Sequence, residues 1–140
     1  MKYAISTAIG VTGSFIASLF GGWTAAMTTL LIFMIIDYVS GLLVASVFHQ
    51  SPITKTGTLE SRAGFKGLCR KGMILLFVLI GYRLDLALDV DYIKNAVCIA
   101  FMVNELISIV ENAGLMGLPV PSVITKAIDV LSQKNESEVE

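Results

Sequence analysis

The feature that most constrains this chain is a long run without charge, because no charged residue lies between Lys2 and Asp37. A helix that crosses the hydrocarbon core of a bilayer needs roughly 20 apolar residues. The run is too long for one such helix and suits two. The pair Gly21-Gly22 lies in its middle, and glycine favours a tight turn because it accepts positive φ. We therefore predict two transmembrane helices, over residues 2–20 and 24–47.

A cleaved signal peptide is the alternative for the first of these segments, because Lys2 precedes an apolar run. That run continues toward residue 47 without a clear small-residue cleavage site. This continuity favours a helix that is retained.

Composition supports a membrane environment. Of the 140 residues, 55% are hydrophobic and 15% are charged, whereas soluble domains average roughly 45–50% apolar and about 25% charged residues. The formal net charge of −1 argues against a nucleic-acid binder. His49, Cys69 and Cys98 form neither a metal-ligand spacing nor a disulfide framework. We therefore predict no cofactor, no metal and no nucleic acid.

Residues 49–72 form a basic segment with a single acidic residue, Glu60. Its basic residues are Lys55, Arg62, Lys66, Arg70 and Lys71. Three of them recur every four residues, which places them on one face of a helix. A basic amphipathic helix of this kind suits the surface of an anionic membrane. The alternative is a solvated loop whose charges only set topology.

Two further spanning helices are predicted after the basic segment. The first begins near Gly72, has an uncharged centre over residues 73–82 and ends in acidic residues. The second covers residues 93–110. Basic residues concentrate on the cytoplasmic side of membrane proteins. This rule places residues 49–72 and both termini in the cytoplasm, and the chain in the cytoplasmic membrane as a multi-pass protein.

The end of the chain is polar. Residues 122–133 have helical apolar spacing but are too few to span, so we expect a short helix at the interface or against its neighbours. Residues 134–140 are predicted to be an acidic, disordered tail after a single helical domain over residues 1–133. The predicted fold is all-α and polytopic, with about four transmembrane helices, a basic amphipathic loop helix and a short C-terminal interfacial helix.

Ionisable and amide side chains at membrane depth are the main functional signal. Such groups are costly in lipid and usually face a bundle interior or a watery path. The candidates for a pore or an intersubunit contact are Asp37, Asn104, Glu105, Ser108 and Glu111. The alternative is that each carboxyl group is satisfied within one subunit, with Arg83 as a candidate partner of Asp37.

Small residues mark a second feature, because faces of small residues let membrane helices approach closely. The candidate helix-packing residues are Gly10, Gly13, Ser14, Ala17 and Gly41. Four of them lie in the first helix, where two adjacent stripes favour self-assembly into a homo-oligomer. Packing against the chain's own helices is the alternative.

Short blocks in a fixed order carry a family resemblance. They are Gly22-Trp23, Asp37-Tyr38 followed by Gly41, Ser61 with Gly64, Gly67 and Lys71, Asn104-Glu105, Ser108-Ile109-Val110-Glu111-Asn112 and Gly117-Leu118-Pro119-Val120-Pro121. Together these blocks resemble the toxin-secretion and phage-lysis holin family. The acidic residues at the end of the chain are not part of the resemblance.

The resemblance implies a holin that oligomerises in the cytoplasmic membrane and forms pores or lesions. An endolysin or a large toxin would cross these lesions without a specific site, and the cell would lyse. Membrane lipids and further copies of the chain are the expected partners. The residues show no catalytic constellation, so no enzyme is predicted. Two alternatives stay open: a small proton-coupled transporter or ion channel that uses Asp37 or Glu105, and a membrane scaffold that binds a partner through its basic loop.

Overall fold

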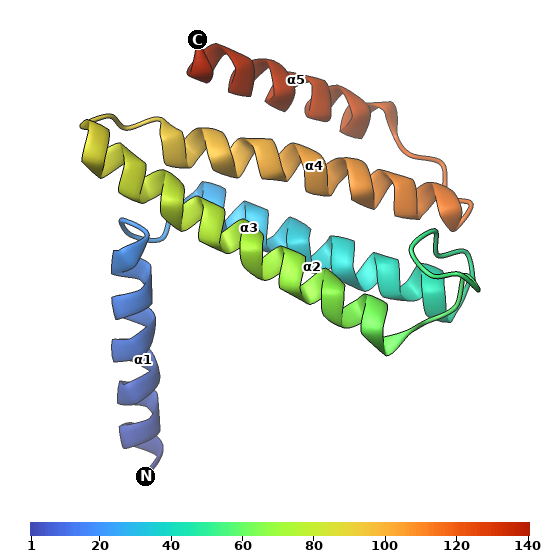
Figure 1. Ribbon diagram of the computed structural model, residues 1–140, viewed down its shortest axis with the longest axis horizontal. Helices are drawn as coiled ribbons and strands as arrows, with labels where there is room; N and C mark the ends of the chain where they lie inside the picture. Colours follow the sequence, from blue (N-terminus) through green and yellow to red (C-terminus); the bar gives the residue numbers. More distant parts are fainter.

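The computed structural model describes all 140 residues and contains five helices and no strands (Figure 1). The helices are α1 (Lys2–Leu19), α2 (Ala25–Ser46), α3 (Ser61–Leu88), α4 (Ile93–Leu115) and α5 (Ser122–Val139). In Figure 1, α2, α3, α4 and α5 lie side by side along one direction, whereas α1 projects away from them. Helix α4 is central, since it packs against α2, α3 and α5.

A small apolar core joins α2, α3 and α4. Leu30, Val78 and Cys98, one from each helix, are almost completely buried, and methionines from α2 and α4 fill the space around them. Only 14 of the 140 residues are buried, and many large apolar side chains point outward. An apolar exterior of this extent needs a partner or a lipid environment.

Helices α2 and α4 are the two elements long and apolar enough to cross a membrane, by length and composition alone. The all-α fold is thus confirmed, but the predicted four spans are not. Helix α3 carries several charged residues at both ends, and the 18-residue α1 contains many serine, threonine and glycine residues, which lower its hydropathy. Helix α1 buries none of its residues.

The second half of the basic segment, residues 61–72, is helical as predicted, but it is continuous with the third predicted helix and not a separate loop helix. Helix α3 runs for 28 residues through Gly72 without a break to Leu88, and the next residue, Asp89, adopts a left-handed conformation with φ of 54°. A single glycine inside a helix lowers its stability by only about 1 kcal/mol relative to alanine. Packing of α3 against α4 outweighs that effect.

The last helix is longer than predicted, because α5 continues to Val139 through residues that we had expected to be disordered. The Asn95 amide at the start of α4 donates hydrogen bonds to both carboxylate oxygens of Glu138, at 3.0 and 2.9 Å. Helix α5 therefore runs antiparallel to α4 (Figure 1). This arrangement places the C-terminus at the opposite end of the bundle from residues 47–60, so it does not support a cytoplasmic location for both.

The predicted turn between the first two helices is confirmed. Gly21 and Gly22 have φ of 76° and 90°, and a side chain at Gly21 would collide with the Tyr82 ring. The Lys94 ammonium donates to the carbonyl oxygens of Phe20 and Gly22, and so ties the end of α1 to α4.

Asp85 at the end of α3 caps the next helix. Its carboxylate accepts hydrogen bonds from the backbone N–H groups of Ile93 and Lys94, at 2.8 and 3.0 Å. These two donors belong to the first turn of α4 and have no partner within their own helix. The buried Asp85 side chain therefore fixes how α4 follows α3.

Candidate functional site

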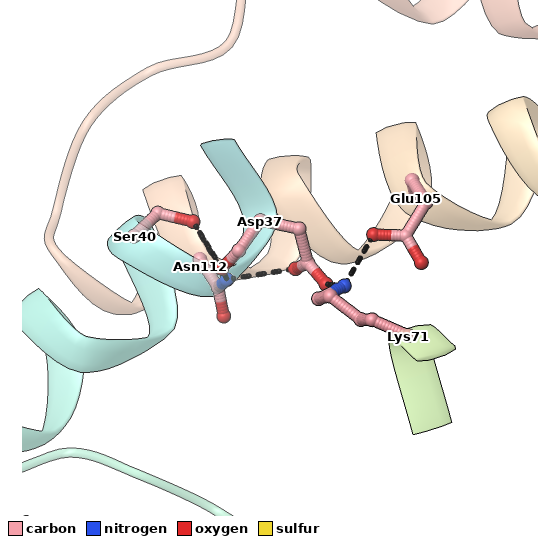
Figure 2. Close-up of polar contacts among 5 residues, drawn as sticks. All are labelled: Asp37, Ser40, Lys71, Glu105 and Asn112. Carbon is pink, nitrogen blue, oxygen red and sulfur yellow. Dashed lines mark hydrogen bonds and ion pairs between the residues drawn. The ribbon is translucent and has the colours of Figure 1, made fainter. Parts of the chain in front are cut away.

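Three charged side chains meet between α2, α3 and α4 (Figure 2). The Lys71 ammonium lies 2.7 Å from Oδ2 of Asp37 and 2.6 Å from Oε2 of Glu105. The side chains of Lys71 and Asp37 are each 15% exposed, and that of Glu105 is 4% exposed. We call Asp37, Lys71 and Glu105 the ion triad. One cation thus holds two carboxylates from different helices.

The position of the triad follows from the charge pattern of the helices. Asp37 lies near the middle of α2, where it is the only charged residue, and Glu105 lies near the middle of α4, whose neighbouring charges, Lys94 and Glu111, are nearer its ends. Lys71 is the last charged residue of α3 before its uncharged stretch. The packing of α2, α3 and α4 brings these three positions to the same height along the bundle. The triad therefore lies at half the depth of both candidate spans.

Asn112 completes the environment of Asp37. Its amide nitrogen lies 3.2 Å from Oδ1 of Asp37, 3.3 Å from the Asp37 carbonyl oxygen and 2.9 Å from Oγ of Ser40 (Figure 2). The Ser40 hydroxyl donates to that same Asp37 carbonyl at 3.0 Å. Both carboxylate oxygens of Asp37 therefore have a partner within the chain.

The electrostatics of the triad are unbalanced. With all groups ionised, two carboxylates and one ammonium carry a net charge of −1 in a mostly apolar bundle. Removing charges from water is costly, and the attraction between them offsets that cost only when geometry is good and further hydrogen bonds exist. The short distances and the Asn112 amide meet both conditions. The triad should therefore be stable while the three helices stay together. If the helices separate in an apolar environment, the unpaired charges become unfavourable.

A cavity of about 380 Å³ opens beside the triad, between α2, α3, α4 and the loop over residues 51–60. Its walls include the triad, Asn112 and Arg70. This space extends from the triad to the loop over residues 51–60 and has both polar and apolar walls. It gives water a route to groups that lie midway along two apolar helices.

The predicted polar residues converge on this cavity. Asn104, Glu105, Ser108 and Glu111 line it together with Asp37. Asn104 and Glu111 are exposed, Ser108 is half-buried and Glu105 is buried. Whether they line a pore in an assembly stays a prediction.

The partner predicted for Asp37 within one subunit was wrong. Lys71, and not Arg83, holds its carboxylate, and Arg83 is exposed. Arg83 lies 12 residues further along α3, or about 18 Å at the rise of an α-helix, and cannot reach the triad. In the sequence, Lys71 falls among the basic residues of the segment over residues 49–72, and no local spacing distinguishes it from Arg70.

The other predicted residues form no ion pair with the triad. Lys55, Arg62, Lys66 and Arg70 are exposed, and Gly41 lines the cavity. In α1, a side chain at Gly10 or Gly13 would meet nothing within 4 Å. Ser14 is exposed and Ala17 is half-buried. The small residues of α1 are therefore not used for close packing inside this chain.

The chain contains no cluster of three or more His, Cys, Asp or Glu side chains that could hold a metal ion. The fold and the site define a small all-α protein with a charged centre between two helices of membrane-spanning length. The chain belongs to the bacteriophage holin family, whose sequence profile matches residues 14–133. The resemblance found in the sequence is thereby confirmed. Together, the family and the two apolar helices indicate a membrane protein.

Relatives match over most of their length. An uncharacterized protein of Halalkalibacterium halodurans is 36% identical over 94% of this chain and 96% of its own length. An uncharacterized 14.9 kDa protein from the nagH 3′ region of Clostridium perfringens is 31% identical over 87% of this chain and 88% of its own. A probable holin of Bacillus phage phi105 is 29% identical over 79% and 77%. No solved structure matches this chain.

Proposed function

We propose that this protein is a holin that assembles with further copies in the cytoplasmic membrane and permeabilises it. An endolysin or another large protein then crosses the lesion and the cell lyses. Membership of the bacteriophage holin family over residues 14–133 is the observation that carries this proposal. The apolar helices α2 and α4 and the polar cavity between them are consistent with it. The cargo needs no binding site, because it passes through an opening.

The ion triad supports a mechanism with two states. In a single subunit, Lys71 neutralises part of the charge of Asp37 and Glu105, so the subunit can stay in lipid without opening a path. In an assembly, the cavity walls of neighbouring subunits face one another and become hydrated. Loss of the membrane potential changes this balance by roughly 2.3 kcal/mol for each charge that moves through 100 mV.

The proposed orientation places residues 49–72 and the N-terminus in the cytoplasm, because basic residues concentrate there. In that orientation, the α3–α4 turn lies outside. A thiol-specific reagent that cannot cross membranes should reach a cysteine at Asp89 in intact cells and should not reach one at Lys55. Labelling at Lys55 before lysis would contradict the orientation.

The decisive experiment is expression of this chain alone in bacteria. We expect leakage of a small dye and then release of a folded cytoplasmic enzyme, because a holin needs no partner to open the membrane. A variant truncated before α4 provides the control for membrane stress caused by expression. Cells that retain both the dye and the enzyme at high expression would refute the proposal.

A small proton-coupled transporter or ion channel is the second candidate. The observation that favours it is the pair of carboxylates, Asp37 and Glu105, that share one ammonium beside a polar cavity. Such an arrangement can exchange protons with water that enters the cavity. Uptake of a solute or ions by reconstituted vesicles, without release of a trapped enzyme, would favour this candidate over the holin.

A further inference from the structure

Helix α5 presents two opposite faces of different chemistry. The face toward α4 contains Ile128, Leu131, Asn135 and Glu138, which alternate at spacings of three and four residues and are half-buried. The other face has similar spacing and is exposed; its residues are Lys126, Asp129, Gln133, Glu136 and Glu140. Residues at these spacings share one side of a helix. Helix α5 is therefore amphipathic, with four charged residues on its outer face.

The contact with α4 extends along most of the candidate span. Glu138 is bound to Asn95 near the start of α4, and the α4–α5 connection lies at the other end (Figure 1). Asp129 lies nine residues before Glu138, or about 13.5 Å along the helix. The same rise takes α4 from Asn95 to the neighbourhood of Glu105. Asp129 is thus level with the ion triad.

This placement is incompatible with lipid on the outer face of α5. If α4 crosses the membrane, Asp129 and Gln133 lie near the middle of the hydrocarbon, where charged side chains are costly unless they meet water or a partner. The structure offers these two side chains no partner in the chain, since both are exposed and neither makes a side-chain hydrogen bond or ion pair. In that position they need water or a partner at membrane depth.

The contact between α5 and α4 is loosely packed and partly polar. Helix α5 buries no residue completely. Its attachment to α4 includes the amide–carboxylate contact between Asn95 and Glu138, and the buried Oδ1 atom of Asn135 has no hydrogen-bond partner.

We propose that α5 lines the aqueous path of the assembled lesion, with the face of Asp129 turned to water and the face of Leu131 on α4. This inference rests on the proposed holin function and adds the element that forms the wall. Further copies of this chain enclose the water on the other sides. The C-terminus then ends at the same side of the membrane as the α3–α4 turn.

The first test measures water access at membrane depth. Purified full-length protein with Cys69→Ser and Cys98→Ala is placed in vesicles of phosphatidylglycerol and phosphatidylethanolamine that contain a trapped enzyme. Asp129→Cys should react with a charged methanethiosulfonate on the order of tenfold faster than the control Ile128→Cys, because a thiol reacts readily where it can ionise. Slow labelling of Asp129→Cys in vesicles that release the enzyme would overturn the proposal.

The second test asks whether α5 stays on α4 while the membrane is open. Asn95→Cys and Glu138→Cys in the same background are joined by a short, reducible bis-methanethiosulfonate. We expect cross-linking in membrane-inserted protein and enzyme release at the rate of the uncross-linked variant. Absence of cross-linking, or release that resumes only after reduction, would show that α5 leaves α4 and would overturn the proposal. Failure of the parent protein to release enzyme would instead refute the holin function itself.

Discussion

Lys71→Met tests whether the ion triad holds the bundle together. Methionine keeps an unbranched side chain of similar length and removes the only cation of the triad. The oxygens of Asp37 and Glu105 lie within 2.7 Å of the Lys71 nitrogen, so the two carboxylates would face each other without a counter-ion. Helices α2 and α4 would then repel each other at the level of the triad.

The expected magnitude follows from the burial of the three side chains. Removing one partner of a buried ion pair destabilises a protein by roughly 3–5 kcal/mol, because the remaining charge is left uncompensated. Lys71 and Asp37 are each 15% exposed beside a polar cavity, so we expect a loss near the lower end, about 3 kcal/mol. Lys66→Met is the matched control, since Lys66 is exposed five residues earlier on the same helix, and should change stability by less than about 0.5 kcal/mol.

Unfolding of the variants in detergent micelles, followed by circular dichroism, provides the measurement. The triple variant Asp37→Asn, Lys71→Met and Glu105→Gln should recover most of the loss, because neutral amides leave no buried charge uncompensated. In cells, Lys71→Met should release a cytoplasmic enzyme earlier than the control. Equal stabilities for Lys71→Met and Lys66→Met would refute the structural role of the triad.

Three further predictions follow from the same structure. Asp37→Leu leaves the Lys71–Glu105 pair intact, so it should lower the free energy of unfolding by only about 1–3 kcal/mol. The variant should nevertheless abolish enzyme release at matched expression. Lysis at the normal time would contradict a role for this carboxyl group. Asp85→Ala removes the cap of α4 and should cost about 1–2 kcal/mol, seen as faster hydrogen exchange in its first turn but not in α2. Gly10→Leu should leave the fold unchanged, because α1 has open space at this position. It should weaken association between subunits by about 1–2 kcal/mol. Unchanged cross-linking ladders would argue against assembly through α1.

Local features of the sequence were enough to predict the first two helices and the need for a partner of the buried charges. Runs of apolar residues and the Gly21-Gly22 turn are local features, and they sufficed to predict where α1 and α2 lie. The isolated charges of Asp37 and Glu105 also showed that something must satisfy them, because an ionised group in an apolar helix is costly wherever it occurs. The order of the short motifs was enough to indicate the family.

Which groups meet depends on how the helices pack. Lys71 resembles Arg70 in the sequence, and the packing of α3 against α4 and α2 turns Lys71 inward and leaves Arg70 exposed. Likewise, residues 134–139 are too polar to predict a helix, and they become helical where Glu138 meets the Asn95 amide. Lys71 lies 34 positions from both Asp37 and Glu105, and Asn95 lies 43 from Glu138. At such separations, contacts between side chains depend on how whole helices pack, and they cannot be predicted from local spacing in the sequence.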